Sequence, residues 1–86
     1  MKKQTDCTII EGAITLELHG YLTTLKVNLP QAEDIVGGDY TLGKAILEGG
    51  IPATAVEKAI VNQSLVSMAH KINVGDYVVL YPLSVK

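Results

Sequence analysis

Apolar and polar residues alternate most regularly over residues 13–19, which read Ala-Ile-Thr-Leu-Glu-Leu-His. A period of two places successive side chains on opposite faces of an extended chain, so this segment is predicted to be a half-buried strand. Residues 7–10 could extend that strand across Glu11 and Gly12, where glycine permits a bulge or a tight turn. Residues 1–6 are expected to form a flexible tail, because order is usually lost at chain ends.

A loop and a second strand are predicted after this first strand. Gly20 ends the alternation, and residues 21–25 are expected to form a loop. Pro30 excludes a central strand at its own position, because proline has no N–H for a sheet hydrogen bond. The second strand is therefore expected within residues 32–36, before the glycine pair at 37–38.

Residues 42–48 are predicted to form a short helix, because Leu42 and Ile46 fall on one helical face. Thr41 or Asp39 can cap its first turn, and the glycine pair at 49–50 supplies its stop. One further helical turn is expected at residues 53–57.

The last third of the chain predicts three strands. Two short strands, at 59–61 and 65–66, flank the turn-like pair Asn62-Gln63. Gly75-Asp76 is a turn signal before Tyr77-Val78-Val79-Leu80-Tyr81. That last run is β-branched and aromatic without a charge, which predicts a central strand covered on both faces.

This order of elements indicates one α+β domain over residues 1–86, because 86 residues are too few for two cores. It is the order of the ubiquitin-like β-grasp, a mixed sheet of four to five strands with one main helix. In that fold the last strand lies in the middle of the sheet beside the first.

Composition limits the partners of this domain. With 48% hydrophobic residues, 19% charged residues and a net charge of −2, the chain is expected to fold. All seven positive charges are lysines, so no nucleic-acid binding is expected. The protein is expected to stay in the cytoplasm. The longest apolar run, at 77–83, is far shorter than the ~20 residues that span a bilayer, so no membrane association is expected. The single Cys7 excludes an internal disulfide and a multi-cysteine zinc site.

One stretch of the sequence resembles a known family. Its residues are Val61-Asn62-Gln63-Ser64-Leu65-Val66-Ser67, His70, Gly75-Asp76, Val78 and Tyr81-Pro82. They are similar to the C-terminal third of the molybdopterin synthase small subunit, whose close relative is the thiamine-pathway sulfur carrier. Leu18, Leu22 and Leu25 around Gly20 are more loosely similar to the first strand and loop of that family.

The resemblance implies a sulfur carrier of molybdenum or tungsten cofactor synthesis, which is not itself an enzyme. Its partners would be a large synthase subunit and an ATP-dependent activating enzyme that adenylates a C-terminal Gly-Gly. Here the tail reads Ser84, Val85 and Lys86, so Lys86 stands where the first glycine is expected and the second is absent, which predicts a non-conjugating relative or a chain that continues further. The alternative is a ubiquitin-like interaction or regulatory module without sulfur chemistry.

By the same resemblance, Leu65, Tyr81, Pro82 and Leu83 are the candidate partner-binding residues. For Leu65, an ordinary sheet position is an equally good interpretation. Tyr81 is favoured because it adjoins the tail and its amphipathic ring suits a partly wet interface.

No catalytic residue, metal site or cofactor is predicted. His70 is interpreted as a turn residue that caps backbone groups, because no second carboxylate or cysteine is spaced to complete a site with it. Cys7 is interpreted as a small, half-buried apolar residue, and His19 as a solvent-facing residue at a strand end.

Overall fold

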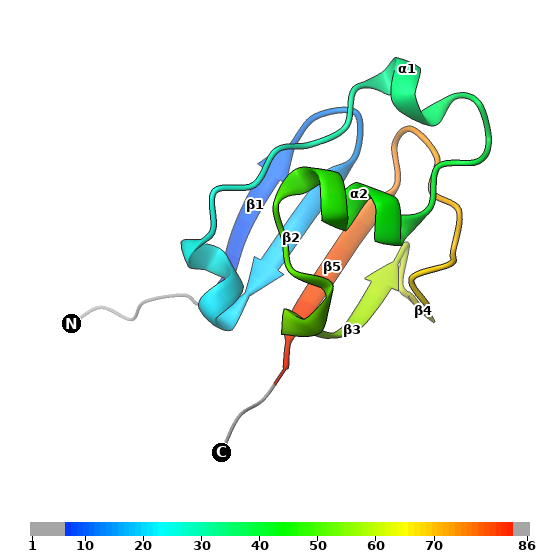
Figure 1. Ribbon diagram of the computed structural model, residues 1–86. Coiled ribbons are helices and arrows are strands. Elements are labelled where there is room, and N and C mark those ends of the chain that lie inside the picture. The colour runs from blue at the N-terminus through cyan, green and yellow to red at the C-terminus, as the bar shows by residue number, and fades with distance from the viewer. Residues whose placement is uncertain (1–6, 84–86) are drawn as a thin grey trace.

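The computed structural model describes residues 7–83, which form one five-stranded sheet in the order β1-β2-β5-β3-β4 (Figure 1). The predicted tail at 1–6 and the residues Ser84, Val85 and Lys86 lie outside the described residues. The strands are β1 (Cys7–Glu11), β2 (Thr15–His19), β3 (Val56–Val61), β4 (Ser64–Val66) and β5 (Tyr77–Pro82).

The first nineteen residues supply two strands where one extended strand was a possibility. β1 and β2 pair antiparallel, from Cys7 opposite His19 to Glu11 opposite Thr15. Gly12 donates its N–H to the carbonyl of Ile14 at 3.0 Å, which closes the turn between them. The sequence allowed either a bulge or a tight turn at Gly12, and the structure has the tight turn.

The predicted strand within 32–36 is wrong, because Ala32–Ile35 forms the short helix α1. The Asp34 carboxylate accepts a hydrogen bond from the Gln31 N–H at 3.0 Å, and the Asp34 N–H bonds the Gln31 carbonyl. These local bonds stabilise the first turn of a helix in place of an extended strand. The second strand of the sheet comes instead from upstream in the chain, where β1 and β2 form a hairpin.

The main helix α2 (Leu42–Gly49) confirms the prediction for residues 42–48. Thr41 is its cap and accepts a hydrogen bond from the Lys44 N–H at 3.2 Å. Its last residue, Gly49, lies against the chain before α1, where an added Cβ would stand 2.7 Å from the Asn28 carbonyl oxygen. The helix therefore packs close to the segment that leads from the first hairpin to α1.

Two 3₁₀ helices complete the fold. The segment Gly20–Thr24 forms η1 where a loop was expected, and Ala53–Ala55 forms η2 within the predicted helical turn at 53–57. Gly20 is in the left-handed region, with φ +59°, and an added Cβ would lie 2.6 Å from Cγ of Pro82. Glycine thus lets η1 pack directly against the end of β5.

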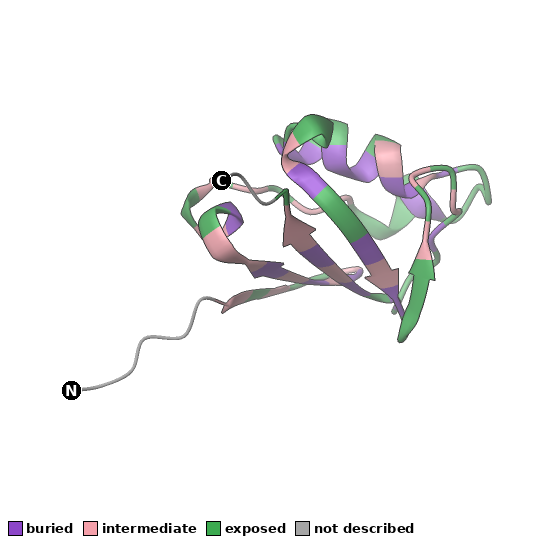
Figure 2. Ribbon diagram, turned by 90° about the horizontal axis from the view of Figure 1, so that it is seen from below, coloured by how far each residue is buried: buried purple, intermediate pink, exposed green. Residues whose placement is uncertain are grey.

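β5 occupies the centre of the sheet, parallel to β2 and antiparallel to β3, as predicted for the last strand. It is covered on one face only, which corrects the expectation of two covered faces. Val78 and Leu80 are fully buried on the side of α2, whereas Tyr77 is 38% exposed and Val79 is half-buried. Figure 2 shows α2 above the sheet and the opposite surface free of helices over the described residues.

These features make the fold a β-grasp-like α+β domain, with one main helix on a mixed sheet. The core lies between α2 and the inner faces of the strands, with Leu18, Leu22, Ile72 and Leu80 among its most buried side chains. None of the helices within residues 7–83 combines the length and apolar character needed to cross a bilayer.

A buried carboxylate joins the β3–β4 hairpin to the turn before β5. Asp76 is 8% exposed and accepts hydrogen bonds from the Asn62 side-chain amide at 2.9 Å and the Asn73 N–H at 2.8 Å. The Asn62 side-chain oxygen in turn accepts from the Tyr77 N–H at 2.9 Å. Asn62 has a positive φ of 51°, so this network also holds a strained turn residue.

Replacing Asp76 with alanine is expected to lower the free energy of unfolding by about 1 to 3 kcal/mol, because two donors lose their buried acceptor. The control is Asp39→Ala, whose side chain is 94% exposed and forms only a 3.8 Å surface pair with Lys71, and it should cost less than about 0.5 kcal/mol. Urea denaturation followed by circular dichroism measures both. Equal effects in the two variants would show that the network does not stabilise the fold.

Candidate functional site on the open face of the sheet

The surface of the sheet that is turned away from α2 is called the open face. All five strands contribute to it because side chains alternate along each strand. Its members are Cys7, Ile9, Glu11, Thr15, Glu17, His19, Lys58, Ile60, Leu65, Tyr77, Val79 and Tyr81.

An apolar row crosses the open face from the β4 edge to the centre of the sheet. Leu65 pairs with Ile60, and Ile60 pairs with Val79, so the three side chains are cross-strand neighbours. Leu65 is 70% exposed, and Ile60 and Val79 are half-buried. We call these three residues the apolar row.

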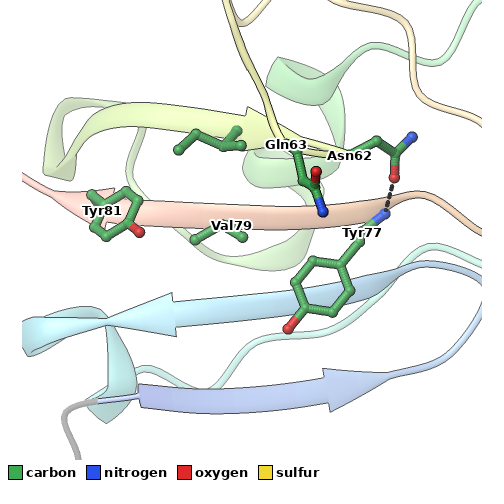
Figure 3. Close-up of a pocket in the computed structure, with 6 residues that line it drawn as sticks. Asn62, Gln63, Tyr77, Val79 and Tyr81 are labelled. Carbon is green, nitrogen blue, oxygen red and sulfur yellow. Dashed lines mark hydrogen bonds between the residues drawn. The ribbon is translucent and has the colours of Figure 1, made fainter.

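A shallow depression of about 800 Å³ lies over this part of the open face. Figure 3 shows Tyr77, Val79 and Tyr81 spaced along β5, with Asn62 and Gln63 at the turn above one end. The walls are therefore aromatic and aliphatic, with amide groups at one end. Such a surface offers contact area together with a few polar groups for orientation.

Tyr81 lies beside the depression and is held from both neighbouring strands. Its ring stacks on the His19 ring, with centroids 4.6 Å apart and planes inclined by 21°. The Lys58 ammonium lies 5.3 Å from the Tyr81 centroid, within the range of a cation–π contact. His19 is thus half-buried against Tyr81, so the expectation of a solvent-facing histidine is wrong.

The remaining candidate partner-binding residues lie at the end of β5. Pro82 packs against Gly20, which is a structural contact. Leu83 is 44% exposed, donates its N–H to the Ala55 carbonyl at 2.8 Å and accepts from the Tyr21 hydroxyl at 3.1 Å. The backbone is therefore fixed as far as Leu83, and the predicted tail residues lie beyond the described part.

A second group of functional side chains lies on the β1–β2 side of the open face. Potential metal-ligating atoms of Cys7, Glu17 and His19 all lie within 4.8 Å of one another. His19 Nε2 is 2.6 Å from Glu17 Oε2, and the Tyr77 hydroxyl donates a short hydrogen bond to Glu17 Oε1. We call Cys7, Glu17 and His19 the hairpin triad.

The hydrogen bonds around Glu17 stabilise its charged form. The hydrogen bond from the Tyr77 hydroxyl has the larger effect, and the one from His19 the next, in holding the pKa of the Glu17 carboxyl below its ordinary value. The same bond raises the pKa of Tyr77 to about 12, because the phenolic proton is shared with a carboxylate. Partial desolvation and the nearby Glu17 charge raise the pKa of the Cys7 thiol.

Sequence reasoning missed the hairpin triad, because it treated Cys7 and His19 as isolated residues. Glu17 and His19 are two apart in a strand, so their shared face was readable from the alternation. The position of Cys7 opposite His19 requires the hairpin register, which depends on where the turn falls. A tight turn at Gly12 was the available signal.

His70 stays outside these groups. Its carbonyl accepts the Leu42 N–H at 2.8 Å, and its N–H bonds the Ser67 carbonyl at 3.1 Å. The backbone of His70 thereby satisfies one of the free donors at the start of α2, in a structural role.

No protein-family model, curated protein or solved structure matches this chain. The fold assignment therefore rests on the strand order and the helix, and function has to be argued from the open face.

Replacing Tyr77 with phenylalanine is expected to raise the pKa of Glu17, because the carboxylate loses its strongest hydrogen bond. Since the folded pKa of Glu17 lies below the ordinary value of 4.5, its stabilising contribution is present above that pH and is lost as the pH falls through the folded pKa. Carbon-detected NMR titration of the carboxyl groups measures the change.

The control for this titration is Tyr40→Phe. Tyr40 donates a hydrogen bond to Glu48 at 2.8 Å, away from the open face. This variant should leave the Glu17 titration unchanged. An unchanged Glu17 pKa in the Tyr77 variant would show that this hydrogen bond does not form in solution.

Proposed function

We propose that this protein is a non-catalytic, ubiquitin-like subunit of the sulfur-carrier type, similar to the small subunit of molybdopterin synthase. It docks through the open face on a large synthase-like subunit in the cytoplasm. The observation that carries the proposal is the apolar row, which runs from the β4 edge to β5, the strand that leads to the C-terminal residues.

The exposure of the apolar row supports docking on a protein surface. Leu65 is 70% exposed, although its cross-strand neighbours Ile60 and Val79 are apolar. A partner that covers the row removes all three side chains from water at about 25 cal/mol per Å² of apolar surface. Tyr81 adds an aromatic anchor beside the row, a residue type enriched at interaction hot spots.

The position of β5 supports a carrier role for the same surface. β5 lies at the centre of the sheet, between β2 and β3, and its outer side chains form part of the open face. A partner seated on that face is therefore adjacent to the chain as it leaves Pro82. The backbone bonds of Leu83 to Ala55 and Tyr21 fix the direction of exit.

Leu65→Glu is expected to weaken binding to the large synthase-like subunit of the same genome by at least ~10-fold, about 1.4 kcal/mol, because a buried charge replaces an apolar contact. The control is Leu47→Glu, since Leu47 is 76% exposed on α2, on the opposite side of the sheet. Isothermal titration calorimetry measures both affinities. Equal affinities for the two variants would contradict docking through the open face.

A second experiment separates a carrier from a module without sulfur chemistry. Lys86→Gly with one added glycine supplies the terminal Gly-Gly of the sulfur-carrier family. We expect the cognate activating enzyme to adenylate this variant with ATP, as measured by pyrophosphate release, and Leu65→Glu on the same background to reduce the rate. Docking without adenylation would favour the interaction module and reject the carrier role.

A further inference from the structure

The hairpin triad brings together three different side chains that bind metals. Cys7 and His19 are directly opposite each other in the β1–β2 register, and Glu17 lies two residues before His19 on the same face. Their ligand atoms lie within 4.8 Å of one another. The arrangement follows from strand pairing, so the backbone positions all three residues.

We propose that the hairpin triad binds one Zn²⁺ ion through Cys7 Sγ, Glu17 Oε2 and His19 Nε2, with water as the fourth ligand. Tetrahedral zinc with bonds of about 2.0 to 2.3 Å places its ligand atoms roughly 3.3 to 3.8 Å apart. Zinc binding requires the 2.6 Å His19 Nε2–Glu17 Oε2 pair to open and the widest ligand separation, at most 4.8 Å, to close, each by side-chain shifts of about 1 Å. The backbone of the hairpin can stay in place.

The donor set fits zinc, and its charge balances a divalent ion. Thiolate, imidazole and carboxylate are all common zinc ligands, and three protein ligands with one open position form a recurrent coordination pattern. On binding, the Cys7 thiol releases its proton to solvent, and His19 binds as neutral imidazole. The thiolate and carboxylate then carry two negative charges, which balance the charge of the ion.

Neighbouring residues already orient two of the three ligands. The Tyr77 hydroxyl holds Glu17 Oε1, which leaves Oε2 directed at His19. The Tyr81 ring stacks on His19 and restricts rotation of the imidazole. Such outer contacts fix ligand geometry and commonly contribute 10- to 100-fold in metal affinity. The direct His19–Glu17 hydrogen bond of 2.6 Å is exchanged for two bonds to the ion.

Cobalt titration of the reduced protein tests the site, because Co²⁺ substitutes for zinc and reports its ligands. We expect a sulfur-to-cobalt charge-transfer band in the near ultraviolet, visible bands typical of four-coordinate cobalt, and displacement of both by Zn²⁺. Cys7 is the only cysteine of the chain, so the sulfur band identifies it without further assignment. One metal ion should bind per monomer, as checked by gel filtration with metal analysis.

Matched variants test Cys7 and His19 as ligands and Tyr77 as a residue that positions Glu17. Cys7→Ser should abolish the sulfur band, and His19→Asn should weaken cobalt binding by more than ~10-fold. His70→Asn should leave binding unchanged, because the backbone of His70 serves the start of α2. Tyr77→Phe should weaken binding by about 10-fold, with Tyr40→Phe as its unchanged control. Amide NMR spectra confirm that each variant is folded.

Three results would overturn the proposal. They are the absence of a sulfur band from the reduced wild-type protein, one metal ion shared by two chains through two copies of Cys7, and equal losses in the His19 and His70 variants.

Discussion

The parallel pairing of β2 with β5 is the contact on which the other features of this fold depend. It joins residues 15–18 near the start of the chain to residues 77–80 near its end. With β5 in the centre, the first hairpin and the β3–β4 hairpin become the two halves of one sheet. Leu18 and Leu80 then face α2 together as paired core residues. Without this non-local pairing, the β1–β2 hairpin has no partner for its inner edge, and an isolated hairpin is only marginally stable.

One helix covers one face of a sheet, and this constraint produces the open face. The described chain has a single helix of eight residues, and all of its buried side chains are directed at the same side of the sheet. The other side of the sheet keeps apolar residues such as Leu65 in contact with water, which is unfavourable in free energy. A surface with no binding role would not need apolar residues there. The proposed docking of a partner gives these residues a role, and the turn network around Asp76 holds the strands that carry them.

The open face carries two kinds of chemistry, which meet at β5. Tyr81 borders the apolar row and stacks on His19, while Tyr77 borders the depression and bonds Glu17. Each tyrosine therefore contacts both the proposed docking surface and the hairpin triad.

The sequence alone determined several of the local elements of this protein. The cap at Thr41, the turn at Asn62 and the uncharged run of valine, leucine and tyrosine before Pro82 each act through near neighbours, so the sequence alone predicts them. The strand predicted within residues 32–36 was wrong because the hydrogen bond between the Asp34 side chain and the Gln31 N–H favours a helical turn, and an extended segment there has no strand to pair with. Only the tertiary structure decided which strand fills the sheet edge, which face stays open and which residue stands opposite His19. Those outcomes depend on the pairing of distant segments. The free energy of that pairing comes from many contacts together, so no single residue or local pattern predicts it.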